Sequence, residues 1–432
     1  MRNIQEVSDN ALCTACGACC GICPTQVISM ETNAAGYLLA TVEVSGCIDC
    51  GMCYDICPSN PENTPGMDKN DIFHGKYLRG YIGHATDKEI RQKSQSGGIV
   101  TALLCYMLDK QLVEGAVVNN INTNTNRPQA VFAKTKKEII KGQGSYYSQS
   151  AVVKTILENK DKKLAAVVLG CQSESLKNIN NKNPKIKLPA YNIGLFCAGQ
   201  HSGKFIDELI VKSGCNKNDV TDFRFRDKDA GGWPGNIKIY TENESYVMNQ
   251  KVRHELKKVY ENYRCLLCFD QMNIFSDVCV GDPWGIERND NKEGNTVIIA
   301  RTQKGKKLIE DAEIDGVIST EELSVKKIIE GQTVDGRLKT QYFTAKEVSK
   351  KNGYIHPYNE KSFEGISHVK PTLIKNQEIK RRLRYSRMIY LKKSINTIKN
   401  LVLLKKLELM VTRFFGGMVI NTLKHFGIID NQ

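Results

Sequence analysis

The sequence lacks the features of a secreted or membrane-spanning protein. Its first residues, MRNIQEVSDNALC, contain no apolar stretch of the kind that a secretory signal needs. No run elsewhere approaches the apolar length that crosses a bilayer. We therefore expect a cytoplasmic protein in a reducing compartment, where clustered cysteines bind metal more often than they form disulfides.

The sequence also lacks an acid–base or nucleophilic constellation. His74, His84 and His201 stand apart from one another, and no nucleophile is paired with a base. The catalytic residues are therefore unknown. This pattern suits redox chemistry, in which bound cofactors carry the reaction.

Cysteine, in contrast, is abundant, and half of the sixteen cysteines form two runs of the pattern C-x2-C-x2-C-x3-C-P. The first run holds Cys13, Cys16, Cys19 and Cys23, and the second holds Cys47, Cys50, Cys53 and Cys57. In such runs three cysteines bind one [4Fe-4S] cluster and the fourth binds the other cluster. We expect Cys57 to join the first three and Cys23 to join the second three. Zinc knuckles or disulfides are the alternatives, but zinc favours a longer gap between ligand pairs.

The chain around these runs resembles a bacterial two-cluster ferredoxin. The segment VISMETNAAGYLLATVEV predicts two short strands around a turn at residues 33–36. Residues 59–71, rich in Pro, Asn and Asp, predict a linker. We expect a ferredoxin domain with two [4Fe-4S] clusters over residues 1–66. Cys20 lies outside the ligand pattern and is interpreted as a packed or bystander thiol.

The segment SQSGGIVTALLCYMLDKQLVEGAVV predicts a helix followed by a strand. Apolar residues recur at helical spacing after Gly98, and Ser96 is the expected N-cap. A glycine loop that leads into a helix N-terminus suits the pyrophosphate of a cofactor. A capped core helix with a glycine turn is the alternative interpretation.

Several separated motifs together resemble the beta subunit family of coenzyme F420 hydrogenase/dehydrogenase. In order, they are the segment from Ser94 to Val118, VVLGCQSESLK, NIGLFCAGQHS, FRFRDKDAGGW, CLLCFDQMNIFSDVCVGDPWG and TVIIART. The resemblance runs from about Tyr77 to about residue 345. It implies an α/β (α+β) flavoprotein that binds FAD, with an N-terminal region at 76–160 and a C-terminal domain at 161–345.

The resemblance also implies site residues. The expected FAD contacts are Ser96, Gly97, Gly98, Thr101, Ser145, Tyr146, Ser148, Gly281 and Asp282. A third [4Fe-4S] cluster beside the flavin would be held by Cys171, Cys197, Cys265 and Cys268. The family has Pro before the first of these, where this chain has Gly170. Cys171 and Cys197 each follow a strand-like apolar run, and an α/β sheet presents ligands at strand ends. Cys105, Cys215 and Cys279 match no ligand position and are interpreted as structural.

The segment FRFRDKDAGGWPG brings Arg224, Arg226 and Lys228 close together in the sequence. Such a basic cluster beside a flavin could hold an anionic substrate or stabilise the reduced flavin by its charge. The alternative is an ordinary exposed turn with Trp233 packed beneath it.

The last part of the chain, residues 346–432, is strongly basic. From Lys375 to Lys424 there are thirteen Lys and Arg against two Glu, which accounts for most of the formal net charge of +14. Leu391, Ile395, Ile398 and Val402 recur at helical spacing beside lysines, which predicts a basic amphipathic helix. It could bind an anionic membrane surface, dock on a partner subunit or fold back on its own domain. Nucleic acid is not expected, because no binding motif accompanies the charge.

These features predict an iron–sulfur flavin-dependent oxidoreductase. Electrons would pass between the clusters and FAD, and between FAD and a two-electron organic acceptor such as coenzyme F420 or another small molecule. The expected partners are an electron donor or acceptor protein, that small molecule and, at the inner membrane face, an anionic lipid surface. An electron-transfer subunit that feeds a partner enzyme is the alternative. A third reading is that the flavin site has been lost.

Overall fold

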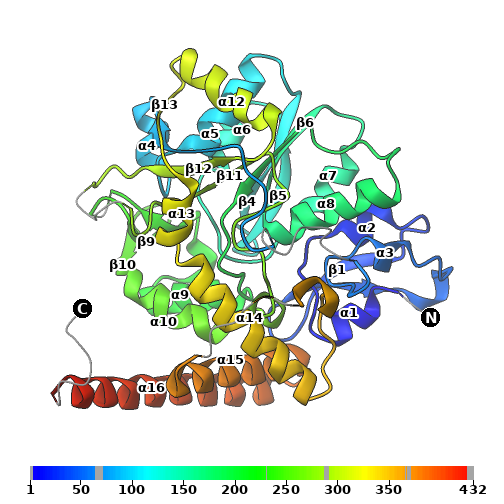
Figure 1. The fold of residues 1–432 in the computed structure, drawn as a ribbon, viewed down its shortest axis with the longest axis vertical. Coiled ribbons are helices and arrows are strands. Elements are labelled where there is room, and N and C mark those ends of the chain that lie inside the picture. Colours follow the sequence, from blue (N-terminus) through cyan, green and yellow to red (C-terminus); the bar gives the residue numbers. More distant parts are fainter. Residues whose placement is uncertain are drawn as a thin grey trace.

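The computed structural model describes residues 3–63, 72–229, 231–286, 291–364, 366 and 371–425. The expected domain boundary at residue 66 and most of the linker predicted at 59–71 lie outside the described residues. The described strands form three sheets, of two, three and eight strands. With helices on both faces of the largest sheet, the fold is a mixed α/β fold, as predicted (Figure 1).

The N-terminal residues form a small module around the predicted hairpin. Strands β1 (Ile28–Thr32) and β2 (Leu38–Val42) pair antiparallel, and Gly36 N donates to Asn33 O at 2.8 Å to close the turn. The hairpin prediction is therefore confirmed. The other elements of the module are α1 (Gln5–Asp9), α2 (Ala18–Ile22), a 3-10 turn (Val44–Gly46) and α3 (Met52–Asp55).

The large sheet has the strand order β13-β3-β12-β11-β7-β6-β4-β5. Its four central strands, β11, β7, β6 and β4, run parallel, and antiparallel strands flank them on both sides. The bounds are β3 Arg79–Ala85, β4 Gly115–Asn122, β5 Arg127–Ala133, β6 Leu164–Val168, β7 Tyr191–Leu195, β11 Val278–Gly281, β12 Thr296–Ala300 and β13 Ile318–Glu322.

Alternate residues of the central strands enter different cores, as the two-residue period of a strand requires. In β4, Ala116 and Val118 face one layer of helices, whereas Val117 faces the layer that includes the N-terminal module. The first layer contains α4 (Lys88–Lys93), α5 (Ile99–Asp109), α6 (Lys136–Lys141) and α12 (Gln303–Ile314). The second contains α7 (Val152–Glu158) and α8 (Gly170–Lys182). The N-terminal module lies beside α7 and α8 (Figure 1).

A smaller antiparallel sheet has its own apolar core with two helices. Its strands are β8 (Asp222–Asp227), β9 (Asn236–Tyr240) and β10 (Ser245–Met248). They pack with α9 (Lys204–Ser213) and α10 (Gln250–Tyr260) around buried Phe205, Phe223 and Phe225. A 3-10 turn, Lys217–Asp219, precedes β8.

The start of α5 differs from the prediction. The helix begins at Ile99 with Gly98 as its N-cap at φ +85°, a conformation that glycine adopts without strain. The Ser96 hydroxyl instead donates to Asn295 O at 2.6 Å, before strand β12. The prediction of Ser96 as N-cap is therefore wrong, because a long-range bond engages its side chain.

The described residues form further helical elements after α10, besides α12. They are α11 (Tyr263–Leu266), α13 (Val325–Gly331), α14 (Val334–Lys351), a 3-10 turn (Glu360–Phe363), α15 (Leu373–Leu391) and α16 (Ile395–His425). Helix α14 continues across residue 345, the expected domain boundary. Helices α15 and α16 lie side by side below the body (Figure 1). No helix among the described residues has the length and apolar character of a membrane span.

The predicted single amphipathic helix is wrong, because the chain leaves helical geometry at residues 392–394 and forms two helices. Ile398 is buried, and Lys405 is 1 % exposed. The basic segment therefore folds back on the body, one of the alternatives that the sequence left open.

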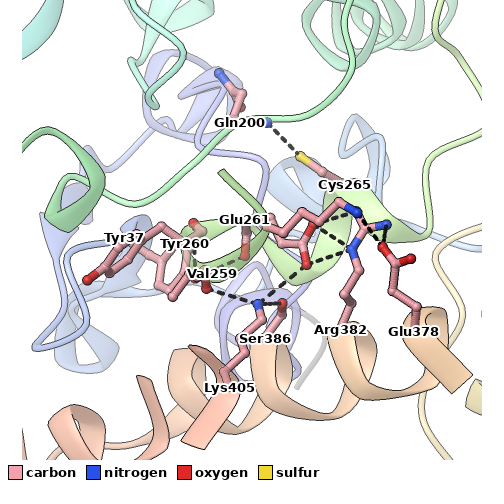
Figure 2. A network of polar contacts seen from close by, with 11 residues as sticks. Tyr37, Gln200, Val259, Tyr260, Glu261, Cys265, Glu378, Arg382, Ser386 and Lys405 are labelled. Carbon is pink, nitrogen blue, oxygen red and sulfur yellow. Dashed lines mark hydrogen bonds and ion pairs between the residues drawn. The ribbon is translucent and has the colours of Figure 1, made fainter. Parts of the chain in front are cut away.

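A buried ionic network holds these helices (Figure 2). Arg382 contacts both carboxylate oxygens of Glu261, the closest at 2.5 Å. Lys405 Nζ donates to Val259 O at 2.9 Å and Ser386 Oγ at 2.8 Å, and lies 3.4 Å from Glu261. Burial alone would raise the pKa of Glu261, but the charges of Arg382 and Lys405 lower it below its usual value.

We expect Glu261→Gln to destabilise the protein by about 3 kcal/mol, because it leaves Lys405 buried without its counter-charge and Arg382 with only the longer contact to Glu378, at 4.0 Å. Chemical unfolding would give the free energy, and hydrogen exchange would show whether α15 and α16 open first. Arg381→Gln is the matched control. Its ion pair with Glu408 is more exposed, so its loss should cost less than about 1 kcal/mol. Equal losses in the two variants would contradict this assignment.

Candidate iron–sulfur and cofactor site

The two cysteine runs adopt the same local backbone. Ala15 and Asp49 occupy equivalent positions with φ of 60° and 52°, and Gly17 and Gly51 follow with φ of 78° and 73°. A short helix then starts in each run, α2 in the first and α3 in the second. The positive φ angles curl each run into a tight loop, so that cysteines two residues apart turn toward a common centre.

The structure places Cys57, the fourth cysteine of the second run, with Cys13 and Cys16 of the first run. Burial raises the pKa of Cys57 well above its usual value, and the charges of Cys16 and Cys13 raise it further. Cys19 also interacts with Cys16 and Cys13. Ala15 N donates to Cys13 Sγ, and Ser59 N to Cys57 Sγ, each at 3.4 Å. Cys13, Cys16, Cys19 and Cys57 are hereafter the first set.

Cys23, the fourth cysteine of the first run, lies in turn with the second run. Cys23, Cys47, Cys50 and Cys53 together line one cavity, and they are hereafter the second set. Burial raises the pKa of Cys53, and the charges of Cys50 and Cys23 add to this effect. Asp49, between Cys47 and Cys50, lies 3.7 Å from Cys47 Sγ.

The four distant cysteines also meet, and they are hereafter the third set. Burial raises the pKa of Cys171 well above its usual value, and the charges of Cys16, Cys197, Cys265 and Cys268 raise it further. Cys171 follows β6 and Cys197 follows β7, so neighbouring strand ends present them. Cys16 belongs to the first set, which therefore lies next to the third.

Gly170 has a steric role at the third set. A Cβ atom at this position would lie 2.5 Å from Asp270 Oδ2, so glycine permits the close approach of this side chain. Asp270 is buried, and its carboxylate accepts from Ile274 N. At the position where the resemblance leads us to expect proline, this chain has Gly170, and here α8 lies in tight contact with the loop after Cys268.

Among the described residues, no three His, Cys, Asp or Glu side chains are arranged to hold a single metal ion. A four-iron cluster is larger than one ion, so the thiolates at its corners stand further apart. Cys105, Cys215 and Cys279 are buried away from the three sets, in apolar clusters, as the sequence indicated.

The two expected FAD loops lie together, joined by a residue that the sequence analysis missed. Gln95 Nε2 donates to Ser145 O at 3.0 Å, and the Tyr147 hydroxyl lies 3.5 Å from Gln95 Oε1. Gln95 stands directly before Ser96, an expected FAD contact, and this position in the sequence could have identified it. Ser148 Oγ donates to His201 O at 3.1 Å.

Several expected FAD contacts have protein partners. Gly97 N donates to Thr296 Oγ1 at 2.8 Å, and a Cβ at Gly97 would lie 2.5 Å from Gly83 O. Tyr146 is buried in the apolar cluster of the small sheet, and Thr101 is buried on α5. A Cβ at Gly281 would lie 2.1 Å from the Phe196 ring. Glycine at 97 and 281 therefore permits close packing.

The basic residues of strand β8 are not an exposed turn. Arg226 is buried and donates to both Asp282 oxygens, at 2.6 and 2.8 Å. Lys228 is also buried, and its ammonium donates to the carbonyl oxygens of Arg91, Ser96 and Glu293. Both side chains therefore hold the loops around Ser96 and Asp282 together. Trp233 is buried beside them, with its Nε1 3.3 Å from Asp282 Oδ1.

A cavity of about 690 Å³ opens beside the two loops. It is lined by Gln95 and Gly144, which adjoin the expected FAD contacts, but by none of those contacts themselves. Its basic lining residues are Lys93, Lys137, Lys141, Arg224, Arg226 and Lys228, and its acidic ones are Glu138, Asp222, Asp227 and Asp229, so the lining has an excess of two positive charges. The size falls within the range of small-molecule sites, and this basic excess favours an anionic ligand.

Backbone contacts connect the third set with the second FAD loop. Gln200 N donates to Cys265 Sγ at 3.4 Å (Figure 2). The next residue, His201, donates its backbone N–H to Tyr147 O at 3.1 Å. Burial lowers the pKa of His201 to about 4, so its ring is neutral at pH 7. The adjacent residues Gln200 and His201 therefore link Cys265 to Tyr147 and Ser148 through hydrogen bonds.

Comparison with known families agrees with this arrangement. Residues 81–157 match the N-terminal region, and residues 161–326 the C-terminal region, of the coenzyme F420 hydrogenase/dehydrogenase beta subunit. Residues 12–61 match a 4Fe-4S dicluster domain.

Individual relatives extend the comparison. Coenzyme F420 hydrogenase subunit beta of Methanosarcina barkeri is 25 % identical over 59 % of this chain and 84 % of its own. Coenzyme F420-dependent sulfite reductase of Methanocaldococcus jannaschii is 24 % identical over 74 % of this chain and 49 % of its own. A chain of the F420-reducing [NiFe] hydrogenase complex from M. barkeri shares the fold, with a TM-score of 0.51 and 22 % identity over 66 % of this chain and 96 % of that chain. The protein thus belongs to the coenzyme F420 hydrogenase/dehydrogenase beta subunit family and carries an N-terminal 4Fe-4S dicluster domain.

Proposed function

We propose that the protein is an iron–sulfur flavoprotein oxidoreductase that passes electrons between [4Fe-4S] clusters and FAD, and between FAD and a two-electron organic acceptor. One observation carries this proposal. The first set of cysteines lies against the third, and the third is bonded through Gln200 and His201 to a loop beside a basic cavity. Bound clusters exchange single electrons, whereas bound FAD exchanges one or two. The clusters and FAD together would therefore connect one-electron carriers with a two-electron acceptor.

The cysteine sets fit three clusters. Each set has four thiols that interact with one another or line one cavity, and loop amides donate to sulfur in the first and third sets. Such N–H···S bonds stabilise the negative charge that thiolates and clusters carry. The sets would hold two clusters in the N-terminal module and one at the carboxyl edge of the large sheet.

The region between the third set and the loops fits a polar cofactor. Within the described chain, buried Oε1 of Gln200, Oε1 of Gln271 and Oγ of Ser202 have no hydrogen-bond partner. Buried polar atoms of this kind are costly unless a ligand or water pairs with them. FAD would be contacted by Ser96, Gly97, Gly98 and Thr101, by Ser145, Tyr146 and Ser148, and by Gly281 and Asp282.

The basic cavity supports an anionic acceptor. Arg224 lines it and is fixed by Asp222 at 2.7 Å and by Gln143 O at 2.6 Å. Lys93, Lys137 and Lys141 line it from other elements. Coenzyme F420 and other carboxylated or phosphorylated small molecules belong to the class that such a cavity would attract.

An iron count tests the third cluster. We expect about twelve iron atoms per chain after anaerobic purification, since three clusters hold four each. Cys265→Ala should lower the count to about eight and remove one cluster signal from the electron paramagnetic resonance (EPR) spectrum. Cys215→Ala, at a buried thiol outside the three sets, should leave about twelve. A wild-type count of about eight would contradict the third cluster, and zinc in place of iron would contradict the whole proposal.

Flavin release tests the FAD site. We expect a flavin absorption band in the wild-type protein and close to one FAD per chain after denaturation. Gln95→Ala removes the amide between the two loops and should weaken FAD binding about tenfold, for a loss of about 1–2 kcal/mol. Gln129→Ala, at an exposed position of β5, should have no effect. A wild-type protein without flavin would favour the reading in which this site has been lost.

The alternative function is an electron-transfer subunit that supplies a partner enzyme and has no substrate site. Relatives named as subunits of F420 hydrogenase and formate dehydrogenase favour a protein partner. Mixing the reduced protein with coenzyme F420 and other small acceptors separates the two functions. Reoxidation without any partner protein supports the enzyme, and reoxidation only after a partner is added supports the subunit.

We also propose that α16 attaches the protein to an anionic membrane surface. Its outer face exposes Leu403, Leu404, Leu407, Met410 and Val411, which recur at helical spacing opposite the buried Ile398 and Lys405. Exposed Lys393 and Lys399 lie at the start of this helix and match anionic headgroups. Figure 1 shows the far part of α16 extending beyond the body.

Vesicle flotation tests this attachment on the full chain. Replacing Leu403, Leu407 and Met410 by Asn should reduce flotation with anionic phospholipid vesicles at least tenfold, since about 1.5 kcal/mol is lost for each apolar side chain. Ile314→Asn, at an exposed apolar residue on α12, is the control and should float like the wild type. Equal flotation of the triple variant and the control would dismiss the membrane role.

A further inference from the structure

Arg264 is a fully buried cation between two of the cysteine sets. It lies on α11 directly before Cys265, and its residue is 1 % exposed. Its guanidinium reaches the chain just after Cys57, where Nε donates to Ser59 Oγ at 2.6 Å and an Nη donates to Pro58 O at 2.9 Å. One side chain therefore ties the third set to the end of the first.

The remaining contacts of Arg264 are also with neutral groups. An Nη donates to the Tyr358 hydroxyl at 2.6 Å, and the guanidinium stacks 4.6 Å from the Tyr358 ring centre. Within the described part of the chain, no carboxylate forms an ion pair with it. Buried Arg226 and Arg382, in contrast, pair with Asp282 at 2.6 Å and Glu261 at 2.5 Å. A buried cation without such a partner is costly unless negative charge lies nearby.

Cysteines of both sets lie beside Arg264. It directly precedes Cys265 in α11, its guanidinium bonds to the carbonyl of Pro58 next to Cys57, and its charge acts on Cys268, Cys265 and Cys57. Tyr358 and the buried carboxyl of Glu174 also act on the guanidinium.

We propose that Arg264 is a positioning residue that raises the reduction potentials of the first and third clusters together and leaves the second cluster unaffected. This inference rests on the proposed function, because it requires clusters in both sets. Reduction takes one electron from the external donor and adds one negative charge to a cluster. A fixed cation in a low-dielectric interior favours that change, and Arg264 lies beside both sets, so it acts on both clusters.

The selectivity follows from the position of the second set. Cys50 is exposed and Cys23 and Cys47 are partly exposed, so solvent screens that set. The charges that act on Cys53 come from Cys50 and Cys23, not from Arg264. The second cluster therefore serves as an internal reference in every sample.

Anaerobic redox titration of the full protein, followed by EPR, tests the inference. We expect Arg264→Gln to lower the equilibrium constant for reduction of the first and third clusters at least tenfold, which is ~59 mV for a one-electron couple. The second cluster should shift less than twofold. Arg301→Gln is the control at another buried arginine, which donates to the carbonyls of His74, Lys76 and Met272 and acts on Asp270 beside the third set. It should shift the third cluster less than Arg264→Gln does and leave the first and second clusters unchanged.

The outcomes separate this inference from the function on which it rests. A wild-type protein without iron overturns both. Intact clusters whose potentials do not move in Arg264→Gln, or that all move equally, overturn the role of Arg264 alone. Should that variant lose its iron, Tyr358→Phe decides, because it keeps every charge but removes the hydroxyl that holds the guanidinium. We expect at least a threefold change in the reduction equilibrium of the third cluster, and an unchanged value overturns the inference.

Discussion

The exchange of Cys23 and Cys57 between the two cysteine runs is the contact on which the rest of the structure depends. Because Cys57 returns to Cys13 and Cys16, the two runs form one unit. A module of about sixty residues buries too little apolar surface to stand firmly alone. Its helix α2 therefore packs on α7 of the large domain, where Val153 N donates to Cys16 O at 2.9 Å. This docking brings Cys16 next to Cys171.

Buried cations organise the large domain in different ways, according to the partner that each one has. Arg226 and Arg382 form ion pairs with buried carboxylates and fix loops or helices. Lys228 reaches three carbonyl oxygens and closes the loop before α5. Arg264 has only neutral hydrogen-bond acceptors, so its charge acts on the neighbouring thiols. The position of each cation in the fold, and not its residue type, therefore decides whether it stabilises the structure or acts on redox groups.

The spatial order of the sites suits passage of electrons in series. The second set is the most exposed, the first lies against the third, and the third leads through Gln200 and His201 to the loop at Tyr147. Among the three sets, an exposed cysteine, Cys50, occurs in the second, where a proposed donor or acceptor protein would approach it. The basic cavity lies beyond the loop, beside Gln95 and Gly144.

The sequence by itself determined the hairpin and the local backbone of the two cysteine runs, and it predicted their crossed pairing, because local spacing dictates which backbone and which ligand geometry are available. Cys171 and Cys197 were predicted from the resemblance to the family, with the apolar strand-like run before each as a supporting signal. The tertiary structure alone decided that Ser96 bonds to Asn295 rather than capping α5, that Lys405 is buried, and that Arg264 joins two cysteine sets. These outcomes depend on contacts between residues far apart in the chain, and the burial that such contacts create decides whether a charge is solvated, paired or left to act on its neighbours.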